Sequence, residues 1–299
     1  MSTASKRSDD GGGEEADGSV RRSARQLLRA VGGGLLIGLP LLFTMEMWFH
    51  SFLLPSWRIV LLLVVAFGVV VGYSAVSGFR RERSWAGLVV DSVQTMGIAA
   101  VVAAGAMLLL GRIDFGVGMR DAVGKVALEM IPVAFGVSLA GTQLAGEDDD
   151  QDRKDRGGPG GDPVGAFGRL VVGAGAALLF ALNVAVTEEP VLLGVEAEWW
   201  LLLAVVAASL AVTLAIVFYA DFRGGRSPDP GDSPMDHPVT ETLAAYAISL
   251  ALSLLLLWAF GRTDGASWSA IAGQVVMLGL VASFGAAAGR LLVGGRAET

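Results

Sequence analysis

Long apolar segments separated by short polar ones make up most of this chain. Runs of about 18 or more apolar residues are long enough to cross a membrane as helices. The apolar positions are continuous rather than alternating, which excludes the strands of a membrane β-barrel. The pattern therefore predicts an all-α integral membrane protein with eight transmembrane helices. They are expected at roughly 28–49, 57–77, 87–110, 121–144, 167–190, 198–220, 241–260 and 267–291.

The second half of the chain resembles the first. Residues 32–46 align without a gap with residues 175–189, at an offset of 143 positions, and later matches follow at offsets of 150 and 149. The matches include Gly32 with Gly175, Leu36 with Leu179, Thr44 with Thr187, Glu46 with Glu189, Trp57 with Trp200, Asp91 with Glu241, and Gly136 with Gly285. Internal duplication is common in transport proteins. We predict two four-helix membrane repeats, at 25–144 and 167–295.

Four spans per repeat is an even number, so both repeats enter the membrane in the same direction. The repeats should therefore be parallel, related by a two-fold axis along the membrane normal. In that arrangement the segment 28–49 should lie beside the segment 167–190.

Three polar stretches flank these repeats. Residues 1–24 are expected to be a disordered tail, residues 145–166 a cytoplasmic linker, and residues 223–238 a second loop of this kind, because they are rich in Gly, Pro and charge. On the predicted topology, 17 of the 22 basic residues lie on the side of these stretches. The positive-inside rule then places both termini in the cytoplasm and the protein in the cell membrane.

Composition excludes several kinds of chemistry. The chain has no cysteine and two histidines, which argues against iron–sulfur clusters, thiolate zinc sites and histidine-based metal centres. No zinc-protease motif, serine nucleophile elbow or nucleotide-binding signature is present. Basic residues are interleaved with acidic ones in short loops, which disfavours nucleic-acid binding. We therefore expect neither an enzyme nor a cofactor or metal.

Acidic residues inside apolar segments are the main functional candidates, because a carboxylate in hydrocarbon is costly. Glu46 lies about 17 residues into the first segment, in the outer part of the bilayer, and Glu189 is its partner in the second copy. Thr44 and Thr187 precede them in a shared Thr-x-Glu pattern, and Glu188 adds a further acid. The pair could bind a cation or relay protons at the seam between the repeats. Alternatively, each glutamate bonds to its own interfacial loop.

Two other acidic groups are weaker candidates. Asp91 and Glu241 form a second matched pair near the cytoplasmic starts of their segments, where an acid also complements the helix dipole. Asp121, Lys125 and Glu129 share one face of the fourth segment. That face could line a pathway, or its lysine and glutamate could neutralise each other. The aligned positions of the second copy are Ala270, Gln274 and Leu278.

The first segment and its flanks, RQLLR at 25–29 through FTMEMW at 43–48, resemble a family of integral membrane proteins of unknown function found in bacteria and haloarchaea. The similarity covers most of residues 21–295. It implies a polytopic membrane protein and supplies no activity or site residues. The second copy departs from the signature, with Glu188 and Pro190 in place of Met45 and Met47.

Two functions are consistent with these observations. The first is a transporter or channel for a small solute or cation, using Glu46, Glu189 and Glu129. The alternative is a non-transporting scaffold or sensor that recruits cytoplasmic partners through its charged linkers. In both cases the lipid bilayer is a partner and nucleic acid is not.

Overall fold

The computed structural model describes residues 11–76, 85–114, 116, 118–144, 166–223 and 237–294. Every regular element in these ranges is a helix, so the all-α prediction is confirmed. The helices are α1 (Gly11–Leu42), α2 (Met45–Leu53), α3 (Ser56–Val76), α4 (Trp85–Leu109), α5 (Met119–Leu144), α7 (Ala166–Ala185), α8 (Glu189–Glu196), α9 (Trp199–Arg223), α10 (Pro238–Ala259) and α11 (Trp268–Gly294).

Seven of the described helices are long and apolar enough to cross a membrane: α3, α4, α5, α7, α9, α10 and α11. An eighth crossing exists only if α1 and α2 count as one span, because the two helices meet at an angle of 74°. The sequence predicted eight continuous spans. The described structure contains seven, together with this bent pair.

The first predicted span, 28–49, breaks after Leu42. Pro40 lacks a backbone N–H, which weakens the last turn of α1. The hydroxyl of Thr44 donates to the carbonyl of Pro40 at 2.6 Å, and the backbone N–H of Thr44 donates to Leu41 at 2.9 Å. These bonds close a tight turn, and α2 leaves in a new direction.

The segment 167–190 also ends early. α7 stops at Ala185, and Pro190 lies in the first turn of α8, where its fixed backbone angle and missing N–H suit a helix start. In addition, the hydroxyl of Thr187 donates to the carbonyl of Val184 at 2.8 Å. The chain therefore turns before Glu189 rather than carrying it inside a span.

The start of the described chain differs in secondary structure from the prediction made from the sequence. α1 begins at Gly11, so residues 11–24 are helical where a disordered tail was expected. Residues 1–10 and nearly all of the linkers expected at 145–166 and 223–238 lie outside the described residues.

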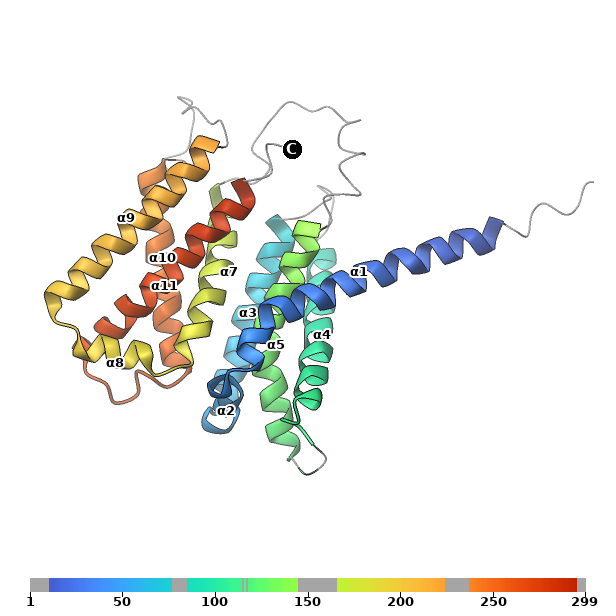
Figure 1. The fold of residues 1–299 in the computed structure, drawn as a ribbon, viewed down its shortest axis with the longest axis horizontal. Coiled ribbons are helices and arrows are strands. Elements are labelled where there is room, and N and C mark those ends of the chain that lie inside the picture. Colours follow the sequence, from blue (N-terminus) through green and yellow to red (C-terminus); the bar gives the residue numbers. More distant parts are fainter. Residues whose placement is uncertain are drawn as a thin grey trace, which may run out of the picture.

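The helices form two bundles that lie side by side, α1–α5 and α7–α11 (Figure 1). α5 packs against every other helix of the first bundle, and α11 packs against every other helix of the second. α5 is accordingly 61% buried along its span, whereas α4 is 22% buried and presents its remaining surface to lipid. The main contact between the bundles joins α3 to α7. α1, the expected neighbour of α7, packs mainly on α5 instead.

Small residues permit the tightest helix contacts. Gly136 on α5 lies against the backbone of Gly33 and Gly34 on α1, so closely that a Cβ atom has no room. In the second bundle, a Cβ on Gly285 would lie 2.7 Å from the carbonyl oxygen of Ala176. Close backbone approach of this kind is a usual source of helix association in membranes.

The two Gly-Arg-x-Asp sequences end α4 and α10. Gly111 and Gly261 adopt left-handed backbone angles, with φ of 64° and 76°. The N–H groups of Arg112 and Arg262 each bond to the carbonyl five residues earlier, at 2.8 Å. This is the Schellman arrangement, which satisfies carbonyls at a helix end and favours glycine at its left-handed position.

Candidate functional site

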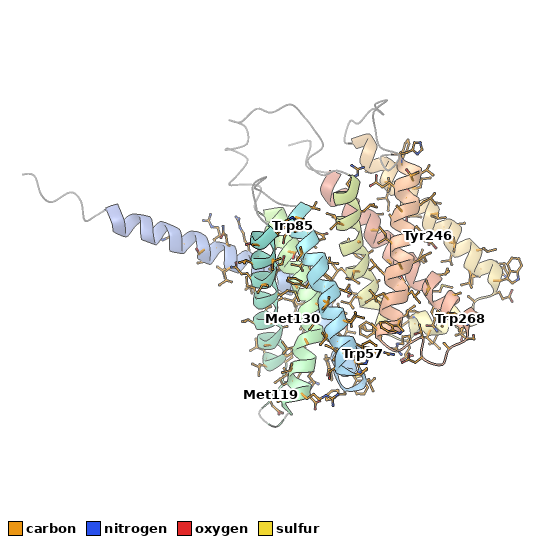
Figure 2. All side chains as sticks on the ribbon, turned by 180° about the vertical axis from the view of Figure 1, so that it is seen from behind. Trp57, Trp85, Met119, Met130, Tyr246 and Trp268 are labelled. Carbon is orange, nitrogen blue, oxygen red and sulfur yellow. The ribbon has the colours of Figure 1, made fainter. Side chains whose placement is uncertain are left out.

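Glu129 is the acidic side chain buried most deeply in the described structure. It lies on α5, has no exposed surface, and neither carboxylate oxygen has a hydrogen-bond partner among the described residues. Ten residues of helical rise separate it from the start of α5, about 15 Å, or half the thickness of the hydrocarbon layer. Figure 2 shows the next residue, Met130, between the ends of its bundle that Met119 and Trp85 mark. Glu129 therefore lies near the middle of the candidate membrane span Met119–Ala140.

Lys125 is one turn away from Glu129 but faces other groups. Its ammonium donates to the carbonyl of Arg112 at 2.8 Å. It also lies 4.9 Å from the ring centre of Phe52 and 5.9 Å from that of Trp48, at distances typical of cation–π contacts. The alternative in which this lysine and glutamate pair with each other is therefore not the arrangement in the structure.

Contacts on either side of Glu129 locate it within the first bundle. Toward the start of α5, Gly124 packs against Ser51 of α2. One turn further on from Glu129, Val133 packs against Gly34 and Gly38 of α1. Glu129 thus lies on α5 between the contact with α2 and the contact with α1. It is level with the bend at which α1 ends and α2 begins.

Glu46 lies in the first turn of α2 and is half-buried. Because the chain bends before it, the depth calculated for a continuous helix does not apply. Its carbonyl oxygen bonds to Nδ1 of His50 at 2.5 Å, and the His50 ring meets Phe260 of the other bundle edge-on, with centroids 5.0 Å apart. Thr44 uses its hydroxyl in the turn between α1 and α2. These contacts anchor the turn and α2.

Glu189 is the first residue of α8 and is exposed. The Thr187 hydroxyl and the backbone N–H of Glu189 itself lower the pKa of this carboxyl, with a smaller contribution from Arg262. Glu188 is also exposed, and it forms an ion pair with Arg262 at 2.5 Å. No hydrogen bond or ion pair joins Glu46 to Glu189, both of which the structure describes. Glu46 opens α2 and Glu189 opens α8.

The second matched pair, Asp91 and Glu241, is placed near helix starts as expected. Asp91 is half-buried in the second turn of α4. Glu241 is buried in the first turn of α10, where it pairs with Arg169 of α7 at 3.4 Å, with 6% and 1% of their side chains exposed. The pair lines a small crevice at this end of the second bundle. Sequence reasoning did not identify Arg169 as the partner of Glu241.

The end of the molecule that carries α2 and α8 holds a further cluster that the sequence did not indicate. Arg58 pairs with Asp264 of the other bundle at 2.9 Å. Its guanidinium lies 5.4 Å from the ring centre of Trp57 and 5.5 Å from that of Trp258. The residues are 206 positions apart along the chain, so no local pattern signals the pairing. The cluster joins the two bundles at this end.

In the described part of the chain, no group of three or more histidine, cysteine or acidic side chains is arranged to hold a metal ion. Glu188 and Glu241 are compensated by arginines, and Glu189 is exposed. Glu129 is thus the buried acid for which the described structure supplies no charge partner.

Comparison with known proteins gives one match. A family model described as "Putative integral membrane protein (DUF2391)" matches residues 26–293. No curated protein and no solved structure matches the chain.

Proposed function

The chain belongs to this family of integral membrane proteins, and from that premise we propose that it moves a proton or another small cation across the membrane by way of Glu129. The observation that carries the proposal is the burial of this carboxylate near the middle of α5 without a partner among the described residues. An ionisable side chain at such a depth is costly and usually marks an ion or proton pathway. A bound proton or cation would neutralise the acid.

The other acidic side chains favour the alternative function, a non-transporting scaffold or sensor. A scaffold is expected to close its acids into pairs or to leave them at the surface. Glu188 and Glu241 are paired and Glu189 is exposed, as a scaffold would have them. Glu129 is neither paired nor exposed, which favours transport. The proposed site is therefore narrower than the sequence suggested: it is centred on Glu129 rather than on Glu46 and Glu189.

We further propose that the two bundles are parallel repeats of one four-helix unit, in which the bent α1–α2 pair crosses the membrane once and corresponds to α7 with α8 following it. The helix ends support this proposal. α1 and α7 end 143 positions apart, α3 and α9 begin 143 positions apart, and α5 and α11 begin 149 positions apart. These are the offsets of the sequence alignment.

Equivalent residues also make equivalent contacts. Ser51 of α2 packs on Gly124 of α5, and the aligned residues, Gly194 of α8 and Gly273 of α11, pack on each other. Likewise, Gly33 of α1 packs on Ala140 of α5, and the aligned Ala176 of α7 packs on Gly289 of α11. A matching residue pair at each contact is expected for a duplicated unit and not for two unrelated bundles.

The duplication strengthens the case for Glu129. Its aligned residue, Leu278 of α11, is equally buried. An apolar side chain therefore occupies this position in the second bundle, so packing does not require an acid here. Retaining a costly carboxylate in one copy is best explained by a task that the other copy does not perform.

For orientation, we propose the cell membrane, with the linkers and both termini in the cytoplasm. The end of the molecule that carries α2 and α8 is opposite the last residues of α5 and α9 (Figure 1). On the predicted topology, five basic residues belong to the end with α2 and α8: Arg58, Arg112, Arg120, Lys125 and Arg262. Few basic residues belong to that end, as the positive-inside rule requires of an outer face.

The proposal is tested by flux into proteoliposomes that contain the purified protein. Proton, sodium and potassium gradients are imposed in turn, and uptake is compared for wild type, Glu129→Gln and Glu189→Gln. We expect wild type and Glu189→Gln to conduct the same ion, and Glu129→Gln to lose at least most of that flux. A Glu129→Gln protein with wild-type flux, or a wild type inactive toward every ion, would overturn the proposal.

A further inference from the structure

The interior of the second bundle contains a row of hydroxyl groups. Ser249 and Ser253 lie one turn apart on α10, and Ser209 and Thr213 lie one turn apart on α9. All four side chains are fully buried. Tyr246 of α10 lies beside the Ser209 hydroxyl, so α9 and α10 meet at this level.

One of these groups has no partner in the described part of the chain: Thr213 Oγ1 is buried and lacks a hydrogen bond. The Tyr246 hydroxyl is also buried and forms no hydrogen bond other than its contact with Ser209. Ser209, Ser249 and Ser253 donate to carbonyls of their own helices at 2.7–2.8 Å, which leaves their oxygens free to accept. A buried polar group without a partner costs free energy, and such groups are commonly satisfied by bound water.

Helix packing does not account for these hydroxyls. The residues aligned with Ser209 and Thr213 are Ala66 and Val70 of α3. Those aligned with Ser249 and Ser253 are Ala99 and Ala103 of α4. All four are fully buried in the first bundle, so apolar side chains of similar size fill the same positions there. The second bundle is therefore polar where the first is apolar.

A small crevice lies near one end of the row, and apolar side chains lie beyond the other end. The crevice beside Arg169 and Glu241 is lined by Val217 of α9, one turn from Thr213, and by Ala245 of α10, next to Tyr246. Beyond Ser253, Leu256 and Leu257 are fully buried and apolar. Figure 2 shows Tyr246 on the side of the bundle away from Trp268, toward the crevice end.

We propose that this row of hydroxyls is a water-filled site for small neutral hydrogen-bonding molecules, entered from the Arg169–Glu241 end of the second bundle. It is separate from Glu129, which lies in the other bundle and would take a charged species. The polar partners are four hydroxyls and one phenol, enough to hold more than one water molecule.

Radiolytic hydroxyl-radical labelling of the protein in nanodiscs, read by mass spectrometry, tests the site, because a buried tyrosine is oxidised when bound water lies against it. Tyr73 is a matched control. Tyr73 and Tyr246 are each 7% exposed, but Tyr73 donates to the carbonyl of Val172 at 3.4 Å. We expect severalfold faster labelling of Tyr246 than of Tyr73. Equal labelling of the two tyrosines in the wild-type protein would overturn the proposal.

A variant that copies the first bundle sharpens the test: Ser209→Ala, Thr213→Val, Ser249→Ala and Ser253→Ala combined. The first bundle packs these apolar residues at the aligned positions, so the variant should keep a cooperative unfolding transition. Tyr246 labelling should then fall to the level of Tyr73. Undiminished labelling in a folded variant would show that the hydroxyls do not hold the water and would also overturn the proposal.

Discussion

Lys125 and Glu129 lie one helical turn apart on α5 and form no ion pair with each other. The ammonium of Lys125 is directed to the carbonyl of Arg112 and to the rings of α2. The carboxylate of Glu129 is left without a described partner inside the first bundle. A lysine and a glutamate at this spacing on an exposed helix would pair. Their separation here gives the lysine a role in holding α2 and leaves the glutamate available to a mobile ion.

The first prediction concerns the free-energy cost of burying Glu129 without a partner. Glu129→Leu should raise the free energy of unfolding by about 1–3 kcal/mol, because it removes a buried polar group without a partner. The side chain it introduces is the one found at the aligned Leu278. Thermal unfolding in detergent measures the change. A destabilised Glu129→Leu protein would mean that the carboxylate has a structural partner.

Substitutions in the buried pair of Arg169 and Glu241 should instead destabilise the protein. Glu241→Gln or Arg169→Met alone should lower the free energy of unfolding by about 3–5 kcal/mol, since each leaves a charge buried without its partner. The double variant should recover much of this loss. A double-mutant cycle on thermal stability measures the coupling, and additive losses would contradict a direct pair.

The Gly111 turn gives a test of backbone conformation alone. A Cβ on Gly111 would meet nothing within 4 Å, yet its φ of 64° is unfavourable for other residues. Gly111→Ala should therefore cost about 1–2 kcal/mol. Gly68, inside α3, also has open space around it, and Gly68→Ala should stabilise the protein by about 1 kcal/mol. If the two substitutions changed the free energy of unfolding equally, the left-handed backbone angle at Gly111 would not be the cause of the loss.

The lowered pKa of Glu189 predicts a small effect of pH on the stability of the protein. Its pKa is lowered from 4.5 chiefly by the Thr187 hydroxyl, so its contribution to stability is present above that value and is lost as pH falls through the lowered pKa. Thr187→Val should unfold at a lower temperature than wild type near neutral pH. In strong acid only the part that comes from the lost Thr187–Val184 hydrogen bond should remain. Thr187→Ser keeps the hydroxyl and should follow wild type, and a pH-independent difference would point to packing instead.

Most of the helices could be predicted from the pattern of apolar residues. The segment expected at 57–77 is α3 at 56–76, and the segment expected at 241–260 is α10 at 238–259. The breaks before α2 and α8 could not be predicted in this way, because both short helices continue the apolar runs. Proline does not decide the matter either: Pro40 precedes a break, whereas Pro132 lies within the continuous α5. After Pro40 the hydroxyl of Thr44 bonds to the proline carbonyl, whereas the residue four positions after Pro132 is Gly136, which has no side chain to do so.

The site was only partly predictable for the same reason. Glu129 was identified by its position in an apolar segment, which is a local signal. The partner of Lys125 depends on how the turn after α4 and the rings of α2 pack on α5, and the partner of Glu241 lies more than 70 positions away. Glu46 and Glu189 were assigned to the bilayer because a continuous helix was assumed. Their places changed once the chain turned before them.

Chemical modification of Glu129 tests the central claim most directly. A membrane-permeant carbodiimide reacts with carboxyl groups in apolar surroundings, and mass spectrometry locates the adduct while flux is measured on the same proteoliposomes. The account predicts an adduct on Glu129, protection by the cation that the protein moves, and loss of flux in proportion to modification. Wild-type flux from protein fully modified at Glu129 would contradict it.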